Sequence, residues 1–432
     1  MKISALRKWQ MGGILKLLFE EWNEGRPTPN GEKFGCGFPY CSEYIDTHYL
    51  DINSVDNFKN IYFPINLNSD FFCIFSENFF STQILKLIYE EKIKVLLLRE
   101  HEGGGDHNLF FNKLKEFIDI HNLKYTSFYL YFANKNLINY YKNNLGDIGL
   151  NVNVSDWLLE HTSLVVHKAL ETNKVNDLGY TFELPTLKND KERKFNFLCL
   201  NRVPKAHRVA FLSRLFKEDI IYDTDWSLLF SPYEFTPLFG EELDKNGKNI
   251  FSIEHFSKYF DRKDLEEHES FLKYFFYTKK KSQYEPSSKS LFNFFGDTKS
   301  THYKETYSNS YCSLVTETSF ENNEEHITEK TLKPFINLHL GIFLSPYKHL
   351  ERVRSFGFQT FSQFWNEEYD NILEPKERMA EVCKIVKELN NNNILQIYKN
   401  ANEILLYNQN HFLNFWKRES CKKYFKSLTY AI

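Results

Sequence analysis

The chain has 432 residues, a formal net charge of −3 at pH 7 and an aromatic content of 17%. Such a length can bury a large core in two or three domains, and only 17 Gly and 12 Pro exclude collagen-like and linker-rich architectures. The near-neutral charge gives no global basic field for nucleic acid or an anionic membrane, so such contacts would need a local patch.

The N-terminal segment 1–22 carries charges inside and directly after its one apolar stretch, which predicts an amphipathic helix and not a secretory signal peptide. The longest apolar runs fall far short of the roughly 18 residues of a membrane-spanning helix. The seven scattered cysteines are typical of thiols in a reducing compartment. Cys36, Cys41 and His48 lack a fourth ligand at a metal-binding spacing. We therefore expect a cytoplasmic protein without a bound metal.

In the first half of the chain, short apolar runs alternate with stretches of helical apolar spacing. The predicted strands are 70–75, 94–99 and 126–132, and the predicted helices are 83–89 and 108–120. This alternation indicates a parallel α/β sheet. Because 173–194 contains Pro185 and a run of charges, it is predicted to be a linker, and we assign an N-terminal α/β acceptor domain to 1–185.

A second α/β series follows, which we assign to a C-terminal domain over 190–390 with an insertion at about 231–310. Its predicted strands are 195–200, 219–222, 311–317 and 341–345, and its predicted helices are 204–216, 347–356 and 375–389. The segment 394–432 is predicted to be helical and long enough to pack back on the N-terminal domain. The fold class is therefore α/β, with two Rossmann-like domains facing a cleft.

The densest group of polar residues follows the strand that ends at Glu317. Thr328 is a candidate helix N-cap, which places Lys330 in the first turn, where free backbone N–H groups favour an anion. Lys330 could neutralise a phosphate, and Glu329 could accept from ribose hydroxyls. Pro334 would bend or restart this helix, and Gly341 is expected to close it. The alternative is that Glu329 and Lys330 are ordinary solvated charges.

A second group, Asn201 to Arg208, occupies the turn between a strand and the next helix. Arg202, Lys205 and Arg208 place cations at the carboxyl end of that strand, where a doubly wound sheet presents its ligand crevice. Arginine suits a diphosphate because its planar fork makes paired charge-assisted bonds. The alternative is a basic turn that serves solubility. Lys330 is expected at the same edge of the same sheet, which favours the ligand-binding interpretation.

A third group, Glu100, His101 and Glu102, precedes three glycines after the strand 94–99. Glycines let a backbone approach a ligand closely, but the loop has neither a GxGxxG pattern nor a P-loop lysine, so nucleotide binding is not indicated. The loop offers a carboxylate or an imidazole that could act as a general base. A turn with solvated charges is the alternative.

The stretch FENNEEHITEKTLKPF and the residues after it, over about 310–372, resemble the donor-binding half of glycosyltransferase family 10, the α-1,3-fucosyltransferases. The resemblance implies that Glu329 binds the ribose and Lys330 the diphosphate of a guanosine diphosphate sugar. It leaves open whether Glu317 or Glu321 matches the glutamate of the family's Phe-Glu-Asn motif. It likewise leaves open which arginine, Arg202 or Arg208, matches the family's.

The resemblance also makes Glu100 the best match to the family's catalytic base, with His101 and Glu102 as competitors. The sequence therefore predicts an inverting glycosyltransferase of the GT-B type that moves a sugar from a nucleotide sugar, the co-substrate, to a glycan hydroxyl. A hydroxylated DNA base is the alternative acceptor, suggested by the Lys279–Lys281 patch and by a composition typical of an A/T-rich microbial or viral genome. A non-catalytic module that binds nucleic acid or protein is the alternative from another class.

Overall fold

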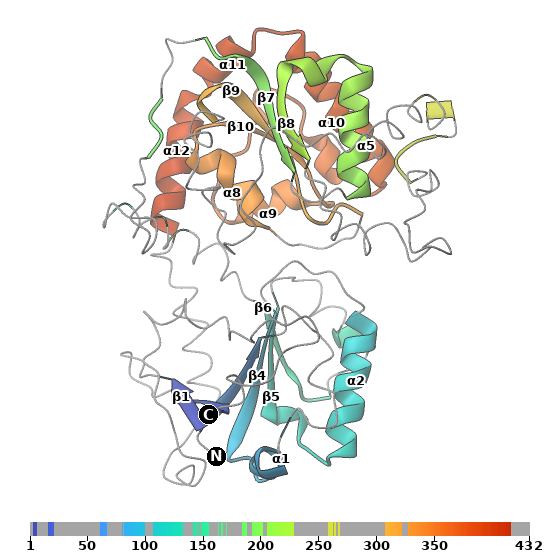
Figure 1. The fold of residues 1–432 in the computed structure, drawn as a ribbon, viewed down its shortest axis with the longest axis vertical. Coiled ribbons are helices and arrows are strands. Elements are labelled where there is room, and N and C mark those ends of the chain that lie inside the picture. The colour runs from blue at the N-terminus through green and yellow to red at the C-terminus, as the bar shows by residue number, and fades with distance from the viewer. Residues whose placement is uncertain are drawn as a thin grey trace, which may run out of the picture. The chain divides into compact units, whose positions relative to one another are not determined.

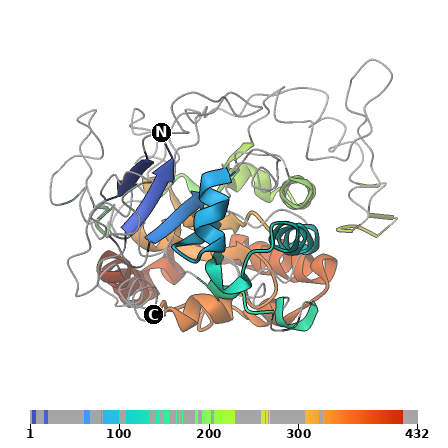
Figure 2. The ribbon, with the colours of Figure 1, turned by 90° about the horizontal axis from the view of Figure 1, so that it is seen from below.

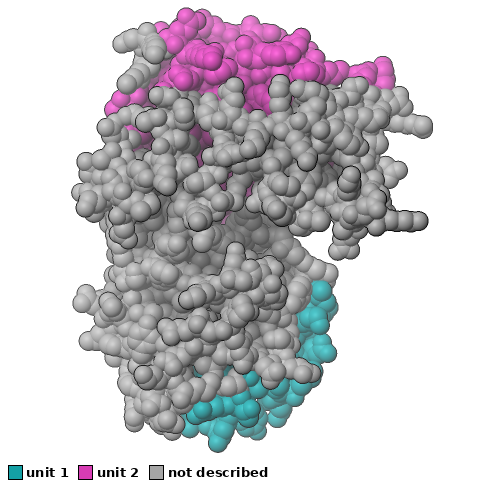
Figure 3. Space-filling model, viewed as in Figure 1, with its two compact units in different colours: residues 1–161, 417–432 teal, residues 162–416 magenta. Residues whose placement is uncertain are grey.

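A computed structural model divides the chain into two compact units, residues 1–161 with 417–432 and residues 162–416 (Figures 1 and 3). The structure describes residues 3–6, 16–20, 61–66, 80, 82–99, 107–132, 141–144, 146, 148–154, 163, 166, 170, 184–187, 192–201, 205–228, 258–261, 263, 264, 267, 307–321 and 327–415. Both units contain parallel β-sheet with helices, so the expected α/β class is confirmed. In the part of the chain that the structure describes, no helix is long and apolar enough to cross a membrane.

The first unit is built on a six-stranded sheet whose strands follow one another in chain order. They are β1 (Ile3–Leu6), β2 (Lys16–Glu20), β3 (Ile61–Asn66), β4 (Ile93–Arg99), β5 (Phe128–Phe132) and β6 (Asn151–Val154). Only β1 and β2 pair antiparallel, and the other neighbours are parallel. The strands at the N-terminal side of this sheet are seen in a second view in Figure 2 (dark blue to blue). The amphipathic helix predicted over 1–22 was wrong, because β1 and β2 lie in that segment.

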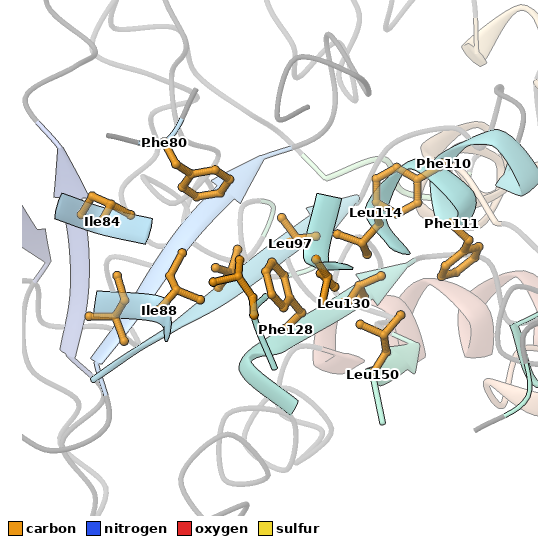
Figure 4. Close-up of a cluster of buried hydrophobic side chains, with 14 of the residues drawn as sticks. Phe80, Ile84, Ile88, Leu97, Phe110, Phe111, Leu114, Phe128, Leu130 and Leu150 are labelled. Atoms are coloured by element: carbon orange, nitrogen blue, oxygen red, sulfur yellow. The ribbon is translucent and has the colours of Figure 1, made fainter. Parts of the chain in front are cut away.

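The core of this unit lies between the sheet and two helices, α1 (Thr82–Tyr89) and α2 (His107–Ile120) (Figure 4). Val95 and Leu97 alternate along β4 and face this core, where they meet Ile88 of α1 and Leu114 of α2. Leu96, which points to the other face of the sheet, is also fully buried. A strand buried on both faces reads as a continuous apolar run, which is why 94–99 was predictable. The predicted strand 70–75 lies outside the described residues.

The second unit contains a four-stranded sheet, all parallel, in the order β10-β9-β7-β8. Its strands are β7 (Phe195–Asn201), β8 (Thr224–Leu228), β9 (Ser310–Thr316) and β10 (Leu340–Leu344). The chain moves from β7 to β8 on one side, then returns to place β9 on the other side of β7. This reversal is a topological switch point, outside which open α/β sheets bind ligands.

The helices of this unit are α5 (Ala206–Lys217), α8 (Glu329–Ile336), α9 (His349–Ser355), α10 (Pro375–Asn390), α11 (Ile394–Asn400) and α12 (Asn402–Asn414). Because crossovers between parallel strands are right-handed, the reversal of strand order sends α5 and α8 to opposite faces. Accordingly, α10 contacts α5, whereas α12 contacts α8 (Figure 1). The described part of the predicted C-terminal helical segment, α11 and α12, packs on β9 and α8 of this unit. Residues 416–432, and with them the expected return to the N-terminal domain, lie outside the described residues.

Two local predictions in this unit were wrong, and one alternative of a third is excluded. The apolar run 219–222 was predicted to be a strand, but Asp219 adopts a left-handed conformation with φ 58° and starts the 3₁₀ helix η6 (Ile220–Asp223). Pro334 does not restart the helix, because α8 runs through it to Ile336. Gly341 does not close α8 but lies inside β10, where Phe343 packs against it.

Candidate functional site at the carboxyl ends of β7 and β9

The switch point brings the carboxyl ends of β7 and β9 together. Their backbone ladder reaches the pair Leu198 and Ser313, and both strands continue for three more residues. At these ends a side-chain bond joins the strands, since the Thr316 hydroxyl donates to Asn201 Oδ1. The backbone N–H of Asn201 donates to Ser227 Oγ of β8 at 3.2 Å. Asn201, predicted to bind the donor, is thus buried and joins three strands at this edge.

The first turn of α5 is fastened to the loop that follows β9. Lys205, the N-cap residue, donates from Nζ to the Thr318 carbonyl at 2.8 Å. Arg208 is buried, with its guanidinium 3.3 Å from the Glu317 carbonyl. His207 donates from Nε2 to the same carbonyl at 2.9 Å. Burial holds the pKa of His207 well below its usual value, so the imidazole is a neutral donor. Arg202, the other predicted cation of this turn, lies outside the described residues.

The first turn of α8 approaches the same loop from the other side. Thr328 is the N-cap, as predicted, and its Oγ1 accepts from the Lys330 backbone N–H at 3.2 Å. The Lys330 ammonium lies 3.0 Å from Thr318 Oγ1 and 3.1 Å from Glu329 Oε1. The side chains of Lys330 and Glu329 are 24% and 33% exposed. Both predicted side chains therefore remain accessible at the edge of the sheet.

Thr318 is the residue on which the two helices converge. Its carbonyl receives Lys205 from α5, and its hydroxyl receives Lys330 from α8. These two lysines are 125 residues apart in the chain, and only the sheet order brings them to one place. Ammonium groups and helix N-termini both favour a bound anion, and here two of each lie next to Thr318.

Glu317 lies beneath this surface and is 1% exposed. Its Oε2 accepts from the Thr328 hydroxyl at 2.6 Å and from the Thr318 backbone N–H at 3.2 Å. Its Oε1 accepts from the Thr331 hydroxyl, and Thr331 Oγ1 lies 2.9 Å from Nε2 of His349, the first residue of α9. Protein donors therefore occupy both carboxylate oxygens in this structure.

Glu321, the alternative match to the family glutamate, has a different environment. Lys258 lies 2.7 Å from its carboxylate, and the Tyr259 hydroxyl donates to it. Burial alone would raise the pKa of Glu321, but the hydrogen bonds from Lys258 and Tyr259 outweigh it and lower that pKa. Tyr259 is fully buried and belongs to the predicted insertion. Glu321 thus fastens the insertion to the loop after β9.

Sequence reasoning missed Lys333. Side chains three or four residues apart share one face of a helix and lean toward its N-terminus, so Lys333 points toward Lys330 and Glu329. Within the described residues, its ammonium has no hydrogen bond or ion pair. Burial lowers the pKa of Lys333, and Lys330 lowers it further against the opposing effects of Glu329 and Glu317. The i+3 spacing from Lys330 was the sequence signal that could have found it.

The carboxylates after α9 serve the fold. Asp370 accepts from the backbone N–H groups of Leu350 and Glu351 at 2.8 and 3.0 Å, which caps α9. Glu367 is buried and accepts from Thr360 at 2.6 Å and from Arg354 at 3.0 Å. Burial raises the pKa of Glu367, and the Thr360 hydrogen bond opposes that shift.

The predicted base candidates Glu100, His101 and Glu102 lie outside the described residues, as do Lys279–Lys281, Cys36, Cys41 and His48. Glu100 directly follows the last residue of β4. Among the residues that the structure describes, no cluster of three His, Cys, Asp or Glu side chains could hold a metal ion. Comparison of the chain with known protein families, curated protein sequences and solved structures finds no match.

Proposed function

We propose that the protein is an inverting glycosyltransferase that transfers a sugar from a nucleoside-diphosphate sugar to a hydroxyl group of a glycan. The observation that carries this proposal is the convergence of Lys205 and Lys330 on Thr318 at the switch point of a parallel sheet. The negative charge of a diphosphate would attract the ammonium groups of Lys205 and Lys330. Lys333, about one turn further along α8, adds a third ammonium group. The family 10 resemblance of 310–372 supports a guanosine diphosphate donor.

In the proposed reaction, the acceptor oxygen forms a bond to the anomeric carbon while the bond from that carbon to the diphosphate oxygen breaks. The diphosphate leaves with the electron pair, and Lys205, Lys330 and Lys333 stabilise its charge. Glu329 accepts from the ribose hydroxyls. Glu100 takes the acceptor proton as general base. In this proposal the two units are the two Rossmann-like domains of a GT-B enzyme.

The test is a thermal-shift panel of GDP, UDP, ADP and their sugar conjugates on the full chain. A ligand at about 100 times its Kd stabilises the native state by about 2.7 kcal/mol, which corresponds to a shift of about 5–10 °C for a unit of this size. We expect this shift with GDP and its loss in Lys330→Ala. The matched control is Lys399→Ala, since Lys399 is exposed on α11.

Turnover separates donor binding from catalysis. Glu100→Gln should keep the GDP-induced shift and lose sugar transfer, and full activity of this variant would move the base to another residue. If no nucleotide stabilises the protein and it binds heparin or DNA in a salt-sensitive manner, the transferase proposal is wrong and a nucleic-acid-binding module replaces it. Transfer to hydroxylated DNA, and not to glycans, would change only the acceptor.

A further inference from the structure

Glu317 contacts the first turns of two helices, α5 and α8, and is linked to the first turn of a third, α9, through Thr331. Its carbonyl accepts from His207 of α5, and its carboxylate accepts from Thr331 of α8, which in turn meets His349 of α9. A buried carboxylate in this position is costly unless donors satisfy it. The Thr318 backbone N–H and the Thr328 and Thr331 hydroxyls satisfy it, and the direction of these hydrogen bonds indicates what the arrangement does.

The Thr328 hydroxyl has one proton, and the direction of that proton is fixed. The backbone N–H and the ammonium of Lys330 both face Thr328 Oγ1 and can only donate, so Thr328 donates its own proton to Glu317 Oε2, 2.6 Å away. The lone pairs of Thr328 Oγ1 are then free to accept from the Lys330 backbone N–H at 3.2 Å and face Lys330 Nζ at 3.4 Å. Without the carboxylate, the same hydroxyl could turn its proton toward Lys330 and repel it.

We propose that Glu317 is a positioning residue that, through Thr328, holds the Lys330 ammonium in place for the diphosphate of the donor. This inference rests on the proposed function. Glu317 does not contact the ligand in this proposal, because the residue is buried and protein donors bind both carboxylate oxygens. Its effect passes through one hydroxyl to one lysine, so the effects of changing Glu317 and Lys330 must be coupled.

The experiment is a double-mutant cycle on GDP affinity, measured by calorimetry with the full chain. Glu317→Gln keeps the shape of the side chain but offers Thr328 an amide, and one hydrogen bond typically contributes about 1 kcal/mol, so we expect GDP to bind about fivefold more weakly in Kd. Lys330→Ala should weaken GDP binding more. In the double variant, the Kd should equal that of Lys330→Ala alone, because Glu317 then has no lysine to position.

The inference is overturned if Glu317→Gln weakens GDP binding by the same factor in the Lys330→Ala variant as in the wild type. Such an effect would not depend on Lys330 and would indicate a general loss of structure. If Glu317→Gln does not fold, two variants of Thr328 decide: Thr328→Val, which keeps the shape and removes the hydroxyl, and Thr328→Ser, which keeps the hydroxyl. Serine retains the hydroxyl and should bind GDP within about twofold of wild type, whereas valine should lose about the same factor as expected for Glu317→Gln. Equal GDP affinity of these two variants refutes the role of the hydroxyl. Absence of GDP binding by the wild type refutes the proposed function itself.

Discussion

His339 makes the stability of the second unit sensitive to acid. The imidazole is fully buried beside β9, with Nδ1 3.0 Å from Ser313 Oγ and Nε2 facing the Tyr307 carbonyl. Burial, reinforced by the nearby Arg193 guanidinium, lowers the pKa of His339 from 6.5 to about 3. Below pH 6.5, His339 is therefore protonated in the unfolded chain but stays neutral in the folded protein. The free energy of unfolding falls as the pH drops from 6.5 toward 3.

The size of this loss follows from the pH range between the two pKa values of His339, 6.5 and about 3. Each pH unit in this range lowers the free energy of unfolding by about 1.4 kcal/mol. Lowering the pH from 7 to 5 should therefore remove about 2 kcal/mol through His339 alone. His207 and His349, whose pKa values burial also lowers, add losses of the same sign. The variant His339→Gln, which is neutral at both pH values, should lose about 2 kcal/mol less.

Hydrogen–deuterium exchange of peptides that cover β9 and β10 measures this loss within the second unit, once the rates are corrected for the pH dependence of intrinsic exchange. Exposed histidines provide the internal control, and His121→Gln should leave the pH dependence unchanged because His121 is exposed. An identical loss between pH 7 and pH 5 in the wild type and in His339→Gln would show that the pKa of His339 is not lowered in the folded protein, and it would refute this reasoning.

Three further variants test the packing and charge around the site. Lys333→Met should weaken GDP binding about tenfold, whereas Lys333→Arg should keep it. Because burial lowers the Lys333 pKa, the wild type should take up a proton when it binds GDP at alkaline pH, and Lys333→Arg should not. Calorimetry in buffers of different ionisation heat measures this uptake. Arg378→Met should lower the free energy of unfolding by at least about 3 kcal/mol, because the guanidinium donates to four backbone carbonyls. Chemical denaturation measures this loss. Gly341→Ala should cost about 1–3 kcal/mol, since its Cβ would lie 2.7 Å from Phe343 Cζ, and adding Phe343→Leu should recover part of that loss.

The sequence determined the elements whose burial is visible in the local pattern of apolar residues. The runs that became β4, β7, β9 and β10 are apolar on both faces, and α2 and α10 repeat their apolar residues at helical spacing, so local pattern and tertiary burial agree there. The first turn of α8 could also be predicted from the local sequence, because the N-cap threonine and the lysine two residues later interact within one turn. Thr328, Glu329 and Lys330 could therefore be named in advance.

Tertiary structure decided where these elements meet. Strand order depends on contacts between distant segments, which apolar periodicity does not encode, so the switch point between β7 and β9 appeared only in the fold. That order brings Lys205 and Lys330 to Thr318 and directs the Glu317 side chain into the protein. Local chemistry thus specified which lysines lie at a helix N-terminus, and the sheet order brought two of them to one residue, because contacts between distant segments form only in the folded chain.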